Sequence, residues 1–79
     1  MRKIIYTIHA LRRLKQRNIS KLLVEGCVKK PDKLISEDDV KRVVKRLNEK
    51  VLVVIYRLVN DKIIIITAYI TSKVKKYFK

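Results

Sequence analysis

The chain has 79 residues, of which 48% are hydrophobic, and it carries 21 Lys and Arg against 7 Asp and Glu, for a net charge of +14. This length predicts one domain over residues 1–79 with a small core, and the hydrophobic content excludes a wholly disordered chain. So large a charge destabilises a compact chain by self-repulsion, so we expect an anionic partner that balances it.

The predicted elements begin with a strand at 3–8, where the sequence KIIYTI is β-branched and aromatic. Thr7 is a candidate N-cap for a helix over 9–17, which has apolar residues on one side and a basic stripe on the other. Ser20 is a candidate N-cap for a second short helix, which continues to about Val28. The sequence KKPD then ends this helix, because proline disfavours a helical residue before it.

The segment 36–48 reads SEDDVKRVVKRLN and fits two kinds of element. Ser36 as a cap, acidic residues in the first turn and apolar residues at helical spacing favour a helix. The high content of β-branched valine favours a strand. The residue pattern alone leaves both interpretations open.

The remaining segments predict a β-hairpin and a short basic helix. VLVVIYRL at 51–58 and KIIIITAYI at 62–70 are strands, with Asn60 and Asp61 as a tight turn between them. Both strands are almost continuously apolar, which indicates that both faces of the sheet are at least partly covered. The last nine residues, 71–79, predict a short basic helix whose apolar residues can dock.

The chain has one cysteine and one histidine, which limits the disulfides and metal sites that it can form. The single Cys27 cannot form an intrachain disulfide, and with the single His9 it cannot make a zinc site. We therefore expect no metal, no cofactor and a reducing, cytoplasmic compartment. No apolar run approaches the roughly 20 residues of a transmembrane helix. Many charges and few thermolabile residues fit a hot-adapted, thermophile source.

A stripe of three residues at i, i+4 and i+8 is the first candidate for chemistry. His9, Arg13 and Arg17 share one face of the first predicted helix. An imidazole can act as an acid or base near neutral pH, and guanidinium groups bind phosphate. The plain alternative is that His9 caps the helix, while the arginines face water or pair with Glu25.

The sequence resembles a known family along most of its length. HALRRLKQRNIS resembles the HAxxRxxxRxIS opening of the domain-of-unknown-function family 4258. The matching positions are His9, Ala10, Arg13, Arg17, Ile19 and Ser20. Pro31 and Asp32 match a proline–aspartate pair of that family, and the TAY at 67–69 resembles its terminal motif. The stretch 51–78 is also similar to toxins of the BrnT type.

The resemblance implies a small α+β fold related to RelE-like and colicin-type ribonucleases. In that fold two N-terminal helices pack on a small twisted antiparallel sheet, with a short C-terminal helix, and residues 40–47 form a strand. We adopt the strand for this segment, because a further helix would leave too few strands for a stable sheet.

The resemblance also implies a toxin-like, metal-independent endoribonuclease that acts on RNA phosphodiesters. We expect His9 as the general base, Arg13 as the group that holds the phosphorane charge, and Tyr69 as a proton donor or stacking surface. The resemblance alone places Tyr69 near the other two, and a strand tyrosine is most often a core residue. Further candidates that bind the nucleic acid are Arg17, Arg57 and Thr67.

Two other functions compete with the endoribonuclease. One is a noncatalytic basic module that binds nucleic acid, RNA or DNA, through phosphate contacts. The other is a small interaction protein with an acidic partner. An acidic antitoxin is the partner expected for a toxin, and an exposed edge strand could also pair in a homodimer. Membrane binding is the weakest hypothesis, because no segment has a large apolar face opposite its lysines.

Overall fold

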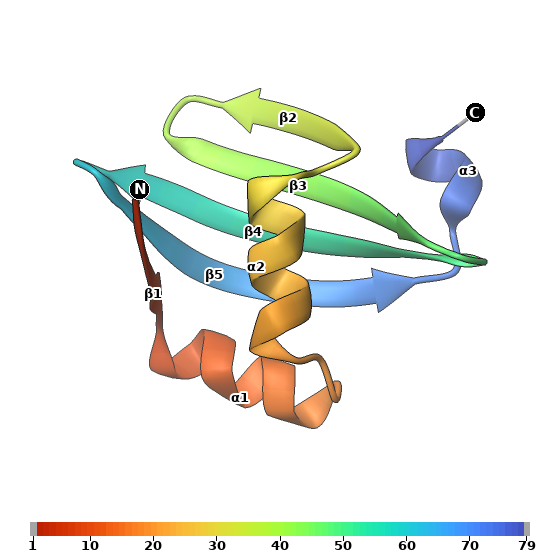
Figure 1. Cartoon of the computed structure of the whole chain (residues 1–79), viewed down its shortest axis with the longest axis horizontal. Helices are drawn as coiled ribbons and strands as arrows, with labels where there is room; N and C mark the ends of the chain where they lie inside the picture. The colour runs from red at the N-terminus through yellow and green to blue at the C-terminus, as the bar shows by residue number, and fades with distance from the viewer. Residues whose placement is uncertain (1, 79) are drawn as a thin grey trace.

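A computed structural model describes residues 2–78 of the chain. Its elements follow in the order β1 (Lys3–Tyr6), α1 (Ile8–Gln16), α2 (Lys21–Lys29), β2 (Lys33–Glu37), β3 (Val40–Leu47), β4 (Lys50–Val59), β5 (Lys62–Thr71) and α3 (Val74–Tyr77). The five strands form one sheet in the order β1-β5-β4-β3-β2, which confirms the α+β class. In Figure 1, α2 crosses one face of the sheet, α1 lies beside β5, and α3 lies where β5 ends.

The sheet is mixed, so the prediction of a wholly antiparallel sheet is wrong for one pair. The pairs β2–β3, β3–β4 and β4–β5 are antiparallel, whereas β1 pairs in parallel with β5. The antiparallel neighbours are joined by short turns that fix their direction. No turn joins β1 to β5, because the whole of the remaining sheet lies between them in the chain.

The two N-terminal helices begin at the residues predicted as their caps. The Thr7 hydroxyl accepts a hydrogen bond from the Ala10 amide at 2.9 Å, and the Ser20 hydroxyl accepts one from the Leu23 amide at 3.2 Å. Each bond satisfies an amide that the first helical turn leaves unpaired. Because Thr7 caps α1, β1 ends at Tyr6 and is shorter than predicted.

The segment whose pattern fits both a helix and a strand is β3. Asp38 and Asp39, the acidic residues that suit a first helical turn, form the turn between β2 and β3, where Asp38 has a φ of 57°. The neighbours Val43 and Val44 are both buried, but they belong to different apolar clusters. Neighbouring residues bury on opposite sides in a strand and not in an amphipathic helix. The strand predicted for residues 40–47 is therefore confirmed.

The predicted hairpin is formed by β4 and β5. Asn60 and Asp61 make the two-residue turn, and Asn60 has a φ of 58°, a conformation that asparagine tolerates. The short basic helix predicted near the end is α3, while Lys79 lies outside the described residues.

Alternate residues of β4 pack into two apolar clusters, one on each face of the sheet. Leu52 and Val54 are fully buried in a cluster that includes buried residues of α1 and α2, namely Ala10, Leu14, Val24 and Cys27. Val51 and Val53 belong to the other cluster, which Tyr77 of α3 closes. The helices α1 and α2 therefore contribute to one side of the sheet, and α3 covers part of the other.

A β-bulge at Ile66 decides which side chains of β5 lie on which face. Ile55 of β4 pairs with Thr67, and the next residue, Tyr56, pairs with Ile65, so Ile66 is the extra residue. Side chains alternate along a strand, so this insertion reverses the faces of all later residues. It places Thr67 and Tyr69 on the face that α3 partly covers.

No helix within residues 2–78 has the length and the apolar character that crossing a membrane requires.

Candidate nucleic-acid interface

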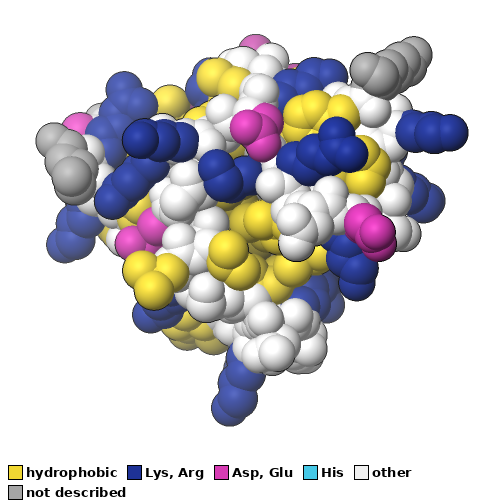
Figure 2. Space-filling model, turned by 45° about the vertical axis from the view of Figure 1, so that its right-hand side comes forward, with side chains coloured by type: hydrophobic (Ala, Val, Ile, Leu, Met, Phe, Trp, Pro, Cys, Tyr) yellow, Lys and Arg dark blue, Asp and Glu magenta, His cyan; other side chains and the backbone are white. Residues whose placement is uncertain are grey.

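Most of the positive charge within residues 2–78 is not paired with a carboxylate. Arg57 and Asp39, with 3.4 Å between Nε and Oδ2, form the single ion pair among residues 2–78. Figure 2 shows Lys and Arg side chains scattered over the visible face among apolar and other groups, with fewer Asp and Glu side chains between them. An anionic ligand would therefore meet little competition from carboxylates of the protein itself.

A polar groove lies between the end of β5 and α3. Its volume is about 600 Å³, and its lining residues are Arg17, Tyr69, Ile70, Thr71, Lys73, Lys76 and Tyr77. Three of these side chains are cationic and none is acidic. We call this hollow the β5–α3 groove.

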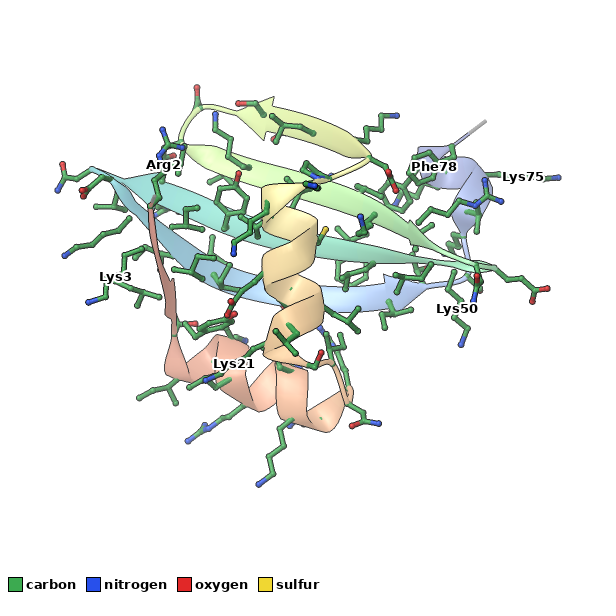
Figure 3. The ribbon with its side chains drawn as sticks, viewed as in Figure 1. Arg2, Lys3, Lys21, Lys50, Lys75 and Phe78 are labelled. Carbon is green, nitrogen blue, oxygen red and sulfur yellow. The ribbon has the colours of Figure 1, made fainter. Side chains whose placement is uncertain are left out.

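The helix α3 forms one wall of the groove and is held there by three kinds of contact. Tyr77 is 7% exposed and packs against the valines of β3 and β4. The Lys33 ammonium donates a hydrogen bond to the Tyr77 carbonyl at 3.1 Å. In Figure 3, Phe78 lies against the end of the sheet and Lys75 points away from it. A four-residue helix is thus fixed by its tertiary contacts and not by its own length.

Two tyrosines meet in the groove. The hydroxyl groups of Tyr69 and Tyr77 lie 3.1 Å apart and share a hydrogen bond. Burial raises the pKa of the Tyr69 phenol, and the bond to Tyr77 raises it further. The positive charges of Arg42 and Arg17 act in the opposite direction. Because the net direction is upward, Tyr69 is a neutral phenol at pH 7 and can donate a proton but not accept one.

Arg17 joins the end of α1 to this groove. Its guanidinium donates to the Ala68 carbonyl at 2.8 Å and to the Thr67 hydroxyl at 3.4 Å. The pairing of β1 with β5 ends at Ile65, so the edge of β5 is free of β1 beyond that residue. Arg17 therefore covers a strand edge and also lines the groove, which brings three predicted site residues together: Arg17, Thr67 and Tyr69.

The other predicted residues lie elsewhere. The Arg13 Nε donates to His9 Nε2 at 3.3 Å on the exposed surface of α1. Helical rise puts His9 about 12 Å from Arg17 along the axis of α1. Within residues 2–78 no hydrogen bond joins either residue to Tyr69, and their convergence on one phosphate stays a prediction. Arg57 pairs with Asp39 near the opposite end of β4.

Four residues of this region were not among the predicted site residues: Arg42, Lys73, Lys76 and Tyr77. The alternation of β3 provides the signal for Arg42, because it shares a face with Val44 once the segment is known to be a strand. The signal for the other three was the basic and aromatic character of the C-terminal segment. That segment also suits a solvated helix, and the sequence does not reveal which way it packs.

The residues of the opening motif have separate structural tasks. Ala10 is 1% and Ile19 is 5% exposed, so both belong to the core, while Ser20 caps α2. Asp32, of the proline–aspartate pair, accepts a hydrogen bond from the Arg46 amide at 2.8 Å, and its own amide bonds to Val44. Of the motif residues, the histidine and the two arginines are the ones left with polar groups at the surface.

Across the described part of the chain, no three side chains of the His, Cys, Asp and Glu types gather closely enough to hold a metal ion.

Comparison with known proteins identifies the family and nothing more. The family model described as Domain of unknown function (DUF4258) matches residues 6–70, which include the opening motif, α1, α2 and most of the sheet. The match ends before Lys73, Lys76 and Tyr77 of the groove. No curated protein sequence and no solved structure gives a match. Since the model covers well over half of the 79 residues, the chain belongs to the DUF4258 family.

Proposed function

We propose that this chain is an RNA-binding protein, related to the RelE and BrnT toxins, and that it holds a single strand in the β5–α3 groove. The observation that carries the proposal is the lining of the groove, in which Arg17, Lys73 and Lys76 surround the two tyrosines with no carboxylate among them. Arginine and lysine bind phosphate, and the partly exposed Tyr69 offers a face on which a base can stack.

The character of the groove favours RNA over an acidic protein. A volume of about 600 Å³ suits a small number of nucleotides, and the lining is more polar than the apolar surface on which a protein partner would need to dock. Unstacked bases and sugar hydroxyls also use hydrogen-bond donors such as the Tyr69 phenol. An acidic protein remains part of the proposal as an antitoxin that would cover the +14 charge when RNA is absent.

Metal-independent cleavage of the bound RNA is the second candidate function. It is favoured by the neutral Tyr69 phenol beside the Arg17 charge. In such a reaction the ribose 2′-oxygen attacks the phosphorus and loses its proton to a base, while the 5′-oxygen leaves with a proton from an acid. Tyr69 can supply that acid, and Arg17 can stabilise the charge of the phosphorane. His9, with Arg13 beside it, is the base that we propose.

Binding is tested by fluorescence anisotropy with a labelled single-stranded RNA, with EDTA in the buffer. We expect Arg17→Gln to weaken binding about tenfold or more, since it removes a charge-assisted contact. Arg12→Gln is the matched control, because Arg12 is an exposed arginine on the same helix. Circular dichroism verifies that both variants fold. Equal affinities of the two variants, or no binding by the unmodified chain at low salt, would contradict the proposal.

Cleavage is read from the same mixtures on a denaturing gel. The products should end in a 2′,3′-cyclic phosphate, and His9→Ala and Tyr69→Phe should each slow cleavage by about 10²–10⁴-fold. His9→Ala should leave the affinity within a few-fold, whereas Arg13→Ala should lower both affinity and rate. Intact RNA after prolonged incubation with a chain that binds it would leave the noncatalytic module as the function.

A further inference from the structure

Part of the sheet face next to the β5–α3 groove is not covered by α3. The buried cluster on this face consists of Val44, Val51, Val53 and Tyr77, and Ile55 packs against it as a partly buried residue. The next residues on this face form a row across three strands. Arg42 of β3 pairs with Ile55 of β4, and Ile55 pairs with Thr67 of β5. All three of these side chains are half-buried and share one face of the sheet.

The Nε–H group of Arg42 donates no hydrogen bond within residues 2–78. Its Nε is buried and has no hydrogen-bond partner among the described residues. A buried donor without a partner destabilises the fold, so its retention calls for an explanation. Ile35, Glu37 and Val40 share a small hollow with Arg42, and the Glu37 carboxylate is the acidic group of that hollow. Arg57 and Asp39 form the single ion pair within residues 2–78, so the Glu37 carboxylate and the Arg42 guanidinium lie more than 4.0 Å apart.

A second guanidinium approaches the same row from the other side. Arg17 donates to the Thr67 hydroxyl at one end of the row, and Arg42 stands at the other end. The two ends are separated by two strand spacings, about 10 Å, with the apolar Ile55 between them. Arg42 shares the face of Val44 by the alternation of β3, and Arg17 lines the groove, so both arginines belong to the side of the sheet on which the groove lies.

We infer that Arg42 and Arg17 form a phosphate subsite above Ile55 and Thr67, which binds a backbone phosphate of the RNA strand that occupies the groove. This inference rests on the proposed function and assigns to it a binding residue, Arg42. The phosphate oxygens accept from the partly exposed Arg42 guanidinium on one side and from Arg17 on the other, and the Thr67 hydroxyl donates between them. Two guanidinium groups provide the planar, paired donors that phosphate binds best.

The test follows the Nε–H resonances of the arginines by NMR in the unmodified, ¹⁵N-labelled chain. Two probes are titrated separately: a short single-stranded RNA and inorganic phosphate. We expect the Arg42 Nε–H signal to shift and saturate with both probes. Arg46 is the internal control, because it lies on the same strand and its Nε already bonds to the Asn48 carbonyl.

Affinity measurements on variants complete the test. Arg42→Gln should weaken RNA binding by about tenfold to a hundredfold, as expected for a charge-assisted hydrogen bond. Arg46→Gln removes the same charge from the same strand and should change binding by no more than about threefold. Arg42→Lys keeps the charge but has no Nε–H in that position, so it should recover part of the loss. Because the NMR titration uses the unmodified chain, a variant that fails to fold does not remove the test.

The outcomes separate the inference from the proposed function. If RNA binds but the Arg42 signal does not move and Arg42→Gln behaves like Arg46→Gln, the subsite is wrong and the groove proposal stands. If inorganic phosphate shifts Arg42 but RNA does not bind, the anion site is real and the RNA function is wrong. If neither probe moves the Arg42 signal and no RNA binds, both are wrong.

Discussion

Lys73 and Lys76 supply two of the four cations proposed to contact RNA phosphates, the others being Arg17 and Arg42. Each phosphate contact to a single strand contributes about 0.7 to the slope of log affinity against log salt, so four contacts predict a slope of about −2.8. Between about 50 and 200 mM salt the affinity should then fall on the order of fiftyfold. The Lys73→Gln, Lys76→Gln double variant should have a slope of about −1.4, and its affinity should fall about sevenfold over the same range.

The assay is fluorescence anisotropy of a labelled single-stranded RNA at several salt concentrations. The matched control is the Lys3→Gln, Lys21→Gln double variant, which loses the same net charge. Figure 3 shows both control lysines on the side of the molecule away from α3. The control should keep the slope of the unmodified chain. Equal slopes for the two double variants, or a slope shallower than about −1 for the unmodified chain, would refute the assignment of these phosphate contacts to the groove.

Three further predictions concern the fold. Ile65 is fully buried, so Ile65→Asp should abolish the cooperative thermal transition, whereas Ile70→Asp at a 37% exposed position of the same strand should keep it; a folded Ile65→Asp variant would contradict the described core. Thr7→Ala removes the N-cap bond of α1 and should lower the free energy of unfolding in urea by about 1 kcal/mol; an unchanged value would show that the cap is not needed. Burial raises the pKa of the Cys27 thiol from 9.0 to about 11. The neutral Cys27 thiol contributes its full stability below pH 9, and this contribution is lost as the pH rises towards about 11. The difference in unfolding free energy between the unmodified chain and Cys27→Ala should therefore shrink over that range. A constant difference would contradict the raised pKa.

The sequence predicted the elements with strong local signals. Thr7 and Ser20 were identified as caps because a hydroxyl residue before an amphipathic segment has few other roles in that position. The hairpin of β4 and β5 followed from β-branched runs around Asn60 and Asp61. The direction of β1 had no such signal, since its partner is distant in the chain and its own residues suit either direction.

The segment 40–47 shows why a pattern can be ambiguous. A strand buried on both faces places apolar residues next to each other, and apolar neighbours at 43 and 44 also satisfy the i, i+3, i+4 spacing of a helix. A helix would need neighbouring elements to cover one side of this segment, whereas a strand would need them to cover both of its faces. A single sequence does not show which sides of the segment are covered. The family resemblance provided the missing information.

The candidate site was predicted in part. Arg17, Thr67 and Tyr69 do lie together, because the opening motif and the TAY segment meet at the end of α1. The positions of Tyr77 and Arg42 depend on how α3 docks and on the face that β3 presents. Both are tertiary features that local spacing does not encode. His9 and Arg13 contact each other as the helical spacing predicts, and whether they act on RNA stays a prediction.

The bulge at Ile66 has a consequence for how the chain folds. Residues 63–66 are all isoleucine, so β5 can pair with β4 either with the bulge or in a regular ladder, and both bury similar side chains in this stretch. The two pairings differ after residue 66, where the regular ladder would turn Thr67 and Tyr69 towards α1 and α2. Arg17, which is 50 residues distant from Thr67 in the chain, donates to the Thr67 hydroxyl in the bulged form. We therefore expect the hairpin to form early in either register and to adopt the bulged register when α1 docks. Substitution of Arg17 should then lower the refolding rate by a larger factor than it raises the unfolding rate.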